Sequence, residues 1–283
     1  MDIRREIAAA AGRPVSDIAP LGGGCVSAVY GVALDDGRQL VAKVDEERTG
    51  LLATEAFMLR YLAERTPLPV PAVVAAGDRV LLMEYVAGDS RFDEAAERHA
   101  AELLAALHDL TAPSFGFEGD TLIGGLRQPN PPADSWLAFF AEQRLVYMAG
   151  EAARAGRLPA TLRARVERLA GQLDRWLEEP ARPALVHGDV WTTNVLAQRG
   201  RITAFLDPAL YFAHPEVELA FIGLFGTFSG AFYRRYHELR PIAPGFFEER
   251  RDLYNLYPLL VHARLFGGSY VAQVERVVAE YGG

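Results

Sequence analysis

Residues 186–196 read Val-His-Gly-Asp-Val-Trp-Thr-Thr-Asn-Val-Leu, and no other run in the chain is as informative about its chemistry. A short apolar strand delivers the carboxylate of Asp189 onto a loop, and the amide of Asn194 follows on the same loop. A second, largely apolar stretch at 202–206 then delivers Asp207. One carboxylate can take the proton of a hydroxyl nucleophile, while an amide oxygen and a second carboxylate can hold Mg²⁺ against phosphates. The run therefore predicts a phosphoryl-transfer site.

A lysine and a glutamate upstream fit the same chemistry. Lys43 lies in an otherwise mostly apolar strand-like run, and a buried lysine needs an anionic partner. Glu55 lies on the helix predicted for 49–64 and can pair with it, whereas the rivals Glu46 and Glu47 precede that helix. We therefore expect an ion pair between Lys43 and Glu55.

A glycine-rich turn joins two strand-like runs near the start of the chain. Backbone N–H groups in such a turn can approach phosphate oxygens closely, although the same pattern also fits an ordinary hairpin. The residues expected to bind phosphates are Gly22, Gly23, Gly24, Cys25 and Ser27. Cys25 fits either a small buried hydrophobe or a reactive thiol whose oxidation, for example to an intermolecular disulfide, would impair nucleotide binding. A monomer and a redox-linked dimer therefore both stay open.

The order of the predicted elements gives a two-part architecture. Strand-like runs, a hairpin turn at 35–37 and one long helix occupy the beginning of the chain, and helical patterns dominate the remainder apart from a strand–loop–strand segment at 184–208. We predict an α+β, bilobal fold with a small β-rich lobe, residues 1–86, and a larger helical lobe, residues 87–283. We further expect helices at 2–11, 95–110, 135–155 and 159–178, a loop at 113–133, and four helical stretches within 215–282.

The composition argues against several other function classes. The 283 residues carry 29 basic and 37 acidic side chains, a net charge of −8, whereas nucleic-acid and membrane-surface binders are more often basic. A single cysteine cannot form an internal disulfide, and the first residues lack the apolar core of a signal peptide. The longest uncharged run, 219–233, is too short for a spanning helix. We expect a cytoplasmic protein without a nucleic-acid partner or a membrane.

The catalytic run resembles that of protein-kinase-like phosphotransferases, in which an Asp base is followed by an Asn and a later Asp that hold the metal. His-Gly-Asp at 187–189 and Asp-Pro-Ala at 207–209 resemble the small-molecule kinases of this group, such as aminoglycoside and choline kinases. The resemblance implies a bilobal kinase-like fold that uses ATP and Mg²⁺. It makes Asp189 the catalytic base, and it makes Asn194 and Asp207 the metal ligands.

The same resemblance assigns nucleotide contacts in the smaller lobe. Lys43, backed by Glu55, would hold the α and β phosphates. Residues 82–86 resemble the hinge between kinase lobes. There, adenine would bond the backbone carbonyl of Glu84 and the backbone N–H of Val86.

Distributed motifs narrow the resemblance to the fructosamine kinase (ketosamine-3-kinase) family. They run in order from Gly22 to about Tyr270, at 107–108, 115–117, 120–124, 128–130, 136–145, 207–220, 224–226, 254–257 and 262–267. The family phosphorylates the sugar 3-hydroxyl of ketosamines, and the 3-phosphate then leaves and frees the amine. The resemblance therefore implies an ATP-dependent deglycation kinase that acts on small-molecule or protein-linked ketosamines.

Substrate contacts are implied at three positions. Trp191 would offer a flat face to the sugar or its linked amine, and His214 and Glu216 would either contact the substrate or fix a loop. Two positions depart from the family pattern without removing a metal ligand: Thr193 stands where Gly is usual, and Glu218 where Asp is common. A kinase for another small alcohol, such as an aminoglycoside or a choline-like compound, stays open, as does a nucleotide-binding protein without catalysis.

Overall fold

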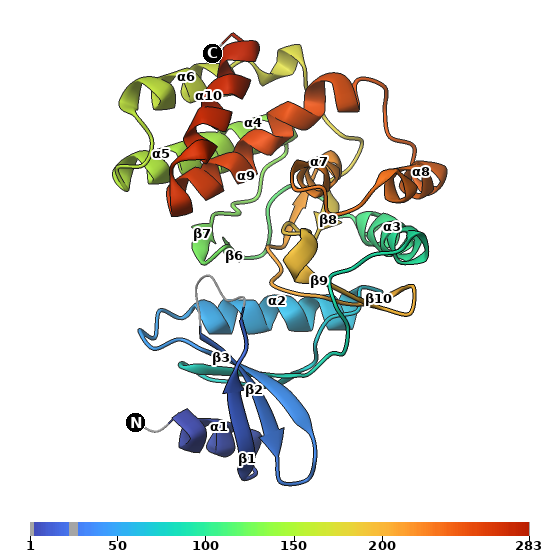
Figure 1. The fold of residues 1–283 in the computed structure, drawn as a ribbon. Coiled ribbons are helices and arrows are strands. Elements are labelled where there is room, and N and C mark those ends of the chain that lie inside the picture. The colour runs from blue at the N-terminus through green and yellow to red at the C-terminus, as the bar shows by residue number, and fades with distance from the viewer. Residues whose placement is uncertain (1–2, 23–27, 283) are drawn as a thin grey trace.

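The computed structural model describes residues 3–22 and 28–282. It consists of a small lobe built on an antiparallel sheet and a larger, mainly helical lobe, with the two ends of the chain at opposite sides of the molecule (Figure 1). The predicted α+β class is therefore confirmed.

The small lobe contains the following described elements: α1 (Ile3–Ala11), β1 (Val15–Pro20), β2 (Ala28–Leu34), β3 (Gln39–Val44), α2 (Leu51–Arg65), β4 (Val73–Ala76) and β5 (Val80–Glu84). Its strands form one antiparallel sheet in the order β1-β2-β3-β5-β4. Burial alternates along β3, as the pattern at 39–44 predicts. Ile7 of α1 is buried against one set of strand residues that includes Leu40, and Leu52 of α2 against another that includes Leu81. The sheet is therefore covered by a helix on each face.

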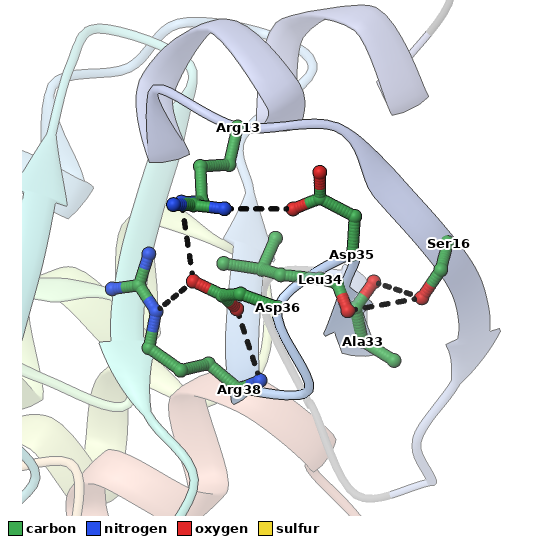
Figure 2. Close-up of polar contacts among 7 residues, drawn as sticks. All are labelled: Arg13, Ser16, Ala33, Leu34, Asp35, Asp36 and Arg38. Atoms are coloured by element: carbon green, nitrogen blue, oxygen red, sulfur yellow. Dashed lines mark hydrogen bonds and ion pairs between the residues drawn. The ribbon is translucent and has the colours of Figure 1, made fainter.

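Charged side chains fix the turn between β2 and β3 (Figure 2). The backbone N–H of Arg38 donates to Asp36 Oδ1 at 3.1 Å, and its Nε donates to Asp36 Oδ2 at 2.9 Å. Arg13 reaches the same carboxylate at 3.2 Å, and Ser16 donates to the carbonyl of Ala33 at 3.0 Å, beside a register shift in the β1–β2 pairing. Because exposed ion pairs contribute little to stability, their main effect is on the geometry of the turn.

The large lobe combines helices with short strands. Its described α-helices are α3 (Glu94–His108), α4 (Trp136–Phe139), α5 (Tyr147–Arg154), α6 (Ala160–Ala170), α7 (Glu216–Leu224), α8 (Gly230–Leu239), α9 (Arg251–Phe266) and α10 (Ser269–Glu280), and its described strands are β6 (Thr121–Ile123), β7 (Leu126–Gln128), β8 (Ala184–Val186), β9 (Val195–Gln198), β10 (Arg201–Phe205) and β11 (Tyr211–Ala213). It also contains two π-helical turns, Phe140–Val146 and Phe246–Arg250, and two 3₁₀ turns, Leu173–Arg175 and Thr192–Asn194. The four helical stretches expected within 215–282 are confirmed. Across 3–22 and 28–282, no helix is long and apolar enough to cross a bilayer.

Three expectations for this lobe need correction. The helix expected at 135–155 is interrupted by a π-helical turn, and the helix expected at 159–178 ends at Ala170. The segment 113–133, expected to be a loop, contains the β6–β7 hairpin. Strands of three residues are too short to show a period of two in a sequence. They form here because distant segments bond to them, as when Thr121 donates to the carbonyl of Leu210 at 3.0 Å.

The lobes meet along α2 and along the linker that follows β5. The linker lies against the β9–β10 hairpin: Thr203 donates to the carbonyl of Ala87 at 2.9 Å, and Asp89 and Ala197 exchange backbone hydrogen bonds. Helix α2 lies between the sheet and the large lobe (Figure 1), where Tyr61 packs edge-on against Phe117 with 5.0 Å between ring centroids. Both the linker after β5 and helix α2 therefore make direct contacts with the large lobe.

Candidate active site

A cavity lies where β3 and α2 face the loops of the large lobe. It has a volume of about 1400 Å³, counting its solvent-filled mouth. Its lining brings together the catalytic and phosphate-binding side chains predicted on these elements, Lys43, Glu55, Asp189, Asn194 and Asp207. Since these residues come from both lobes, the fold itself assembles the cluster.

Lys43 bridges the two lobes at this cluster. It lies on β3, and its Nζ donates to Glu55 Oε1 on α2 at 2.6 Å and to Asp207 Oδ1 in the large lobe at 2.5 Å. Burial alone would lower the pKa of Lys43, but the two carboxylates raise it above its ordinary value. The ammonium therefore stays charged, and the predicted pair with Glu55 is present.

Asp189 and Asn194 are joined directly. Asp189 follows β8, and the 3₁₀ turn Thr192–Asn194 directs the Asn194 amide back toward it. Asn194 Nδ2 donates to Asp189 Oδ2 at 2.8 Å and to the Asp189 carbonyl at 3.1 Å. Burial and the nearby charge of Asp207 raise the pKa of Asp189 to about 8, while the bond from Asn194 lowers it. The carboxyl group is thus fixed in position, and its pKa lies well above that of an exposed aspartate.

Asp207 follows β10 and has a left-handed backbone, with φ of 53°. Its side chain is about half exposed and faces the cavity. The β9–β10 pairing and the bond from the Leu206 N–H to the Asn194 carbonyl, at 2.8 Å, hold Asp207 and Asn194 on adjacent loops. A non-glycine residue in this region is strained and persists only where its surroundings enforce it.

The oxygen donors of Asn194 and Asp207 fit a magnesium ion. With Nδ2 of Asn194 bonded to Asp189, Oδ1 is the atom left to ligate a cation, and Asp207 adds a carboxylate. Within the part of the chain that the structure describes, no group of three or more His, Cys, Asp and Glu side chains could hold a metal by itself. Mg²⁺ usually needs only one or two protein ligands, because phosphates and water complete its coordination.

Gly188 lies in backbone contact with the loop that follows Asp207. Its φ is 85°, and a Cβ at this position would lie 2.2 Å from the carbonyl oxygen of Ala209. The N–H of Ala209 donates to the carbonyl of His187 at 2.8 Å, so the loop that carries Asp189 and the loop that carries Asp207 interlock at this point. Only glycine can satisfy both the conformation and the contact.

A buried brace holds Gly188 from the other side. Glu218 Oε1 accepts the N–H of Gly188 at 2.7 Å, and its Oε2 lies 2.8 Å from His108 Nε2, whose other ring nitrogen lies 2.6 Å from the Tyr236 hydroxyl. Burial alone would raise the pKa of Glu218, but the hydrogen bond and charge of His108 lower it. His108 Nε2 therefore donates to an ionised carboxylate. Sequence reasoning missed this function of Glu218, and the only signal was an acidic residue inside an apolar run.

Replacement of Gly188 by alanine is expected to abolish turnover. The added Cβ must move the catalytic loop away from Ala209, and a displacement of this size at a reacting group costs about 100-fold or more in kcat. Gly156→Ala is the matched control, because Gly156 also has a positive φ, 69°, but a Cβ there meets nothing within 4 Å. Steady-state kinetics of the two variants, with thermal unfolding alongside, test this; equal losses of activity would contradict it.

The remaining wall of the cavity is largely apolar and aromatic. Trp191 lies on the lining, 5.7 Å from Phe225 between ring centroids, and Phe266 of α9 closes the wall with about half of its surface exposed. His262 also lines the cavity, and its Nδ1 donates to the carbonyl of Pro258 at 2.8 Å. Trp191 is therefore placed beside Asp189, as the substrate assignment requires.

His214 and Glu216 lie outside the cavity lining. Glu216 is buried and accepts two hydrogen bonds from Arg250, each 2.7 Å long. His214 Nδ1 accepts the N–H of Glu216 at 3.1 Å, its ring lies against Tyr254, and burial lowers its pKa to about 3. Of the two roles predicted for them, these contacts match fixing a loop.

The other nucleotide contacts predicted from the sequence are only partly described. Gly22 follows β1 and has open space around its Cα, whereas Gly23, Gly24, Cys25 and Ser27 lie outside the described residues. Glu84 ends β5, where its N–H donates to the carbonyl of Ala72 at 2.9 Å. Neither Glu84 nor Val86 belongs to the described lining of the cavity.

Comparison with known sequences gives a consistent relationship along the whole chain. A model of the fructosamine kinase family matches residues 1–281. A Synechocystis protein named as a probable ketoamine kinase is 36% identical over 290 residues, which cover 98% of this chain and 95% of that protein. The protein-ribulosamine 3-kinase of Arabidopsis thaliana, named as chloroplastic, is 29% identical and covers 94% of this chain and 83% of its own.

Solved structures agree with this relationship. A candidate fructosamine-3-kinase from Thermobifida fusca superposes with a TM-score of 0.86 at 35% identity and 99% coverage of both chains. An aminoglycoside phosphotransferase in complex with ADP and hygromycin B gives a TM-score of 0.69 at 19% identity over the full length of both chains, which establishes a shared fold. The predicted kinase-like fold and the predicted phosphotransferase class are therefore confirmed. The match of the family model to almost every residue establishes that the chain belongs to the fructosamine kinase family.

Proposed function

We propose that the protein transfers the γ-phosphoryl group of ATP to the 3-hydroxyl of a ketosamine, after which the 3-phosphate is eliminated and the amine is released. The observation that carries this proposal is the joining of Lys43, Asp189, Asn194 and Asp207 at one cavity, with Trp191 on its wall. The two lobes are proposed to extend over residues 1–86 and 87–283, with the cavity between them. The cytoplasm is the proposed compartment.

Asp189 is the proposed catalytic base. As the bond from the sugar oxygen to the γ-phosphorus forms and the bond to the ADP oxygen breaks, the proton of the 3-hydroxyl passes to the Asp189 carboxylate. The bond from Asn194 Nδ2 to Oδ2 holds the carboxylate and leaves Oδ1 for this proton. Its raised pKa, about 8, makes the Asp189 carboxylate a stronger base than that of an exposed aspartate.

The phosphates are proposed to bind between Lys43 and the metal ligands. Lys43 points its ammonium at Asp207 with Glu55 behind it, so the fold itself positions the charge that would meet the phosphates. Mg²⁺ held by Asn194 Oδ1 and Asp207 would supply positive charge to the phosphate oxygens. Backbone N–H groups of the glycine-rich turn are proposed to bind the phosphates, and the backbones of Glu84 and Val86 are proposed to hold adenine. The residues of that turn are Gly22, Gly23, Gly24, Cys25 and Ser27.

Trp191 is the proposed contact for the sugar or its linked amine, because it lies on the lining next to Asp189. His214 and Glu216 are proposed to fix the start of α7 through Arg250 instead of touching substrate. Cys25 keeps both of its proposed roles, a buried hydrophobe or a thiol whose oxidation links two copies of the chain.

The test is release of ADP from Mg-ATP with fructoselysine, ribuloselysine and an aminoglycoside panel, each run beside Asp189→Asn. Turnover on a ketosamine, lost in the variant, is the expected result, and the loss of the adduct is checked by mass spectrometry. Turnover on the aminoglycosides alone would refute the ketosamine substrate while keeping the mechanism. Nucleotide binding without turnover on any of these alcohols would contradict the kinase assignment as stated.

A further inference from the structure

We propose that the β6–β7 hairpin clamps the segment that follows Asp207 and thereby presents the Asp207 carboxylate to the metal site. The clamp consists of Thr121, Gln128, Asn130 and Arg144, which have no role in the catalytic cluster described above. The inference rests on the proposed function, because it assigns these residues to the conformation of a proposed metal ligand. They are positioning residues, and none of them belongs to the described lining of the cavity.

The first contacts are to two consecutive backbone carbonyls. Thr121 Oγ1 donates to the carbonyl of Leu210 at 3.0 Å, and Gln128 Nε2 donates to the carbonyl of Ala209 at 3.0 Å. Both donors are fully buried, and Gln128 also donates to Thr121 at 2.9 Å. Since buried carbonyls left without a donor are costly, the segment is stable in the conformation that satisfies both.

A second set of contacts fixes the donors themselves. The side-chain Nδ2 of Asn130 donates to Thr121 Oγ1 at 2.8 Å, and its side-chain Oδ1 accepts from Arg144 at 2.6 Å. The hydroxyl of Tyr257, on α9, donates to Gln128 Oε1 at 2.7 Å. The carbonyl of Ala209 can only accept and the guanidinium of Arg144 can only donate. These two partners therefore fix the orientations of the Gln128 and Asn130 side-chain amides.

Arg144 adds a buried positive charge to this hydrogen-bond network. It is fully buried on the first π-helical turn, and its described hydrogen bonds go to carbonyl and amide oxygens, including the carbonyl of Pro129 at 2.8 Å, not to a carboxylate. Its guanidinium lies 4.0 Å from the ring centre of Tyr211, at the end of the clamped segment. A buried cation held by dipoles and a π face needs all of them in place, so the network favours a single arrangement.

The clamped segment joins the two features that most need support. Ala209 accepts from Gln128 and donates to His187, so it is fixed between the hairpin and the catalytic loop. Asp207, two residues earlier, has the strained φ of 53°. The clamp supplies the surroundings that keep this residue left-handed and its carboxylate directed at the cavity.

Thr121→Val tests the clamp, because it removes a hydroxyl that makes three of these hydrogen bonds without changing the size of the side chain. Two readouts are used: amide hydrogen exchange over 205–213 in the ligand-free protein, and Mn²⁺ affinity in the presence of ADP, measured by electron paramagnetic resonance. We expect exchange at least tenfold faster and Mn²⁺ affinity at least fivefold weaker. Thr121→Ser keeps the hydroxyl and should restore both. Thr227→Val is the matched control, since Thr227 is also buried but its hydroxyl has no described partner.

Wild-type exchange in Thr121→Val would overturn the proposal, because the hairpin would then not hold the segment. Faster exchange with unchanged Mn²⁺ affinity would also overturn it, because holding the segment would then not present Asp207 to the metal. Equal effects in Thr227→Val would also overturn it, because they would mark general loosening of the lobe. Failure of the proposed function has a different signature. If the wild-type protein bound ADP but no Mn²⁺, the metal role of Asp207 would be wrong, while exchange in the ligand-free protein would still decide whether the hairpin holds the segment.

Discussion

Asp189→Asn is expected to lower kcat by about 1000-fold, because a positioned general base contributes roughly 100- to 10,000-fold. The same change is expected to stabilise the fold. Asparagine can still accept the hydrogen bond from Asn194, and it removes a partly buried carboxyl group that lies near the charge of Asp207. At pH 5 we expect a gain of about 1 kcal/mol in the free energy of unfolding, which raises Tm by about 2–4 °C.

The stabilisation should depend on pH with a definite sign. The folded-state pKa of Asp189, about 8, lies above the value of about 3.9 for an unfolded aspartate. Between these values the folded protein binds the extra proton, so wild-type stability falls as pH rises toward 8 and is level above it. The Tm difference between Asp189→Asn and wild type should therefore widen from pH 5 to pH 8. Thermal unfolding at each pH measures this Tm difference, and Asp174→Asn, a substitution at an exposed aspartate, is the control. A Tm difference that stays constant with pH would contradict the raised pKa of Asp189.

Lys43→Met is expected to lower kcat/KM for ATP by at least about 100-fold, since truncating one member of a buried, hydrogen-bonded charge pair costs roughly 2–5 kcal/mol. Methionine keeps the length of the side chain but leaves Glu55 and Asp207 without their shared cation. We expect the free energy of unfolding to fall by about 2–3 kcal/mol, below the cost of breaking a fully buried pair, because Asp207 can reach water. Urea denaturation and initial rates at varied ATP give both quantities.

The double variant Lys43→Met/Glu55→Gln separates the two effects. Neutral glutamine removes the unpaired carboxylate next to the methionine, so most of the lost stability should return. Activity should not return, because no ammonium is present to meet the phosphates. Recovery of activity in the double variant would show that Glu55, and not ATP, is the functional partner of Lys43.

Residues that lie close together in sequence made much of the site predictable. Asp189 and Asn194 share one loop, and the next strand hairpin leads to Asp207. Lys43 was recognisable because an alternating strand makes a single charged residue conspicuous, and Glu55 lies on the next helix. In each case the strand, helix or loop that carries the residue also positions its side chain. A short stretch of sequence was therefore enough to predict these site residues.

The clamp could not be predicted, because its contacts join residues far apart in sequence. Thr121 and Leu210 are 89 positions apart, and Gln128 and Ala209 are 81 apart. Nothing in a three-residue strand indicates which distant carbonyl it will meet. The same limit applies to Glu216, whose partner Arg250 lies 34 positions downstream. A polar residue near a catalytic motif can therefore be predicted either to contact the substrate or to fix a loop, until its hydrogen-bond partner in the fold is known.

The place of Trp191 on the cavity wall also gives the protein a built-in optical reporter. The sequence has three tryptophans. Trp136 is fully buried and stacked on Phe140, and Trp176 packs against Tyr281 near the end of the chain. Among the tryptophans that the structure describes, Trp191 is the one on the cavity lining, so we expect a change in emission on adding a sugar adduct to come mainly from this indole. Ligand binding can thus be followed in unlabelled protein, and Trp191→Phe removes the signal while leaving an aromatic ring on the wall.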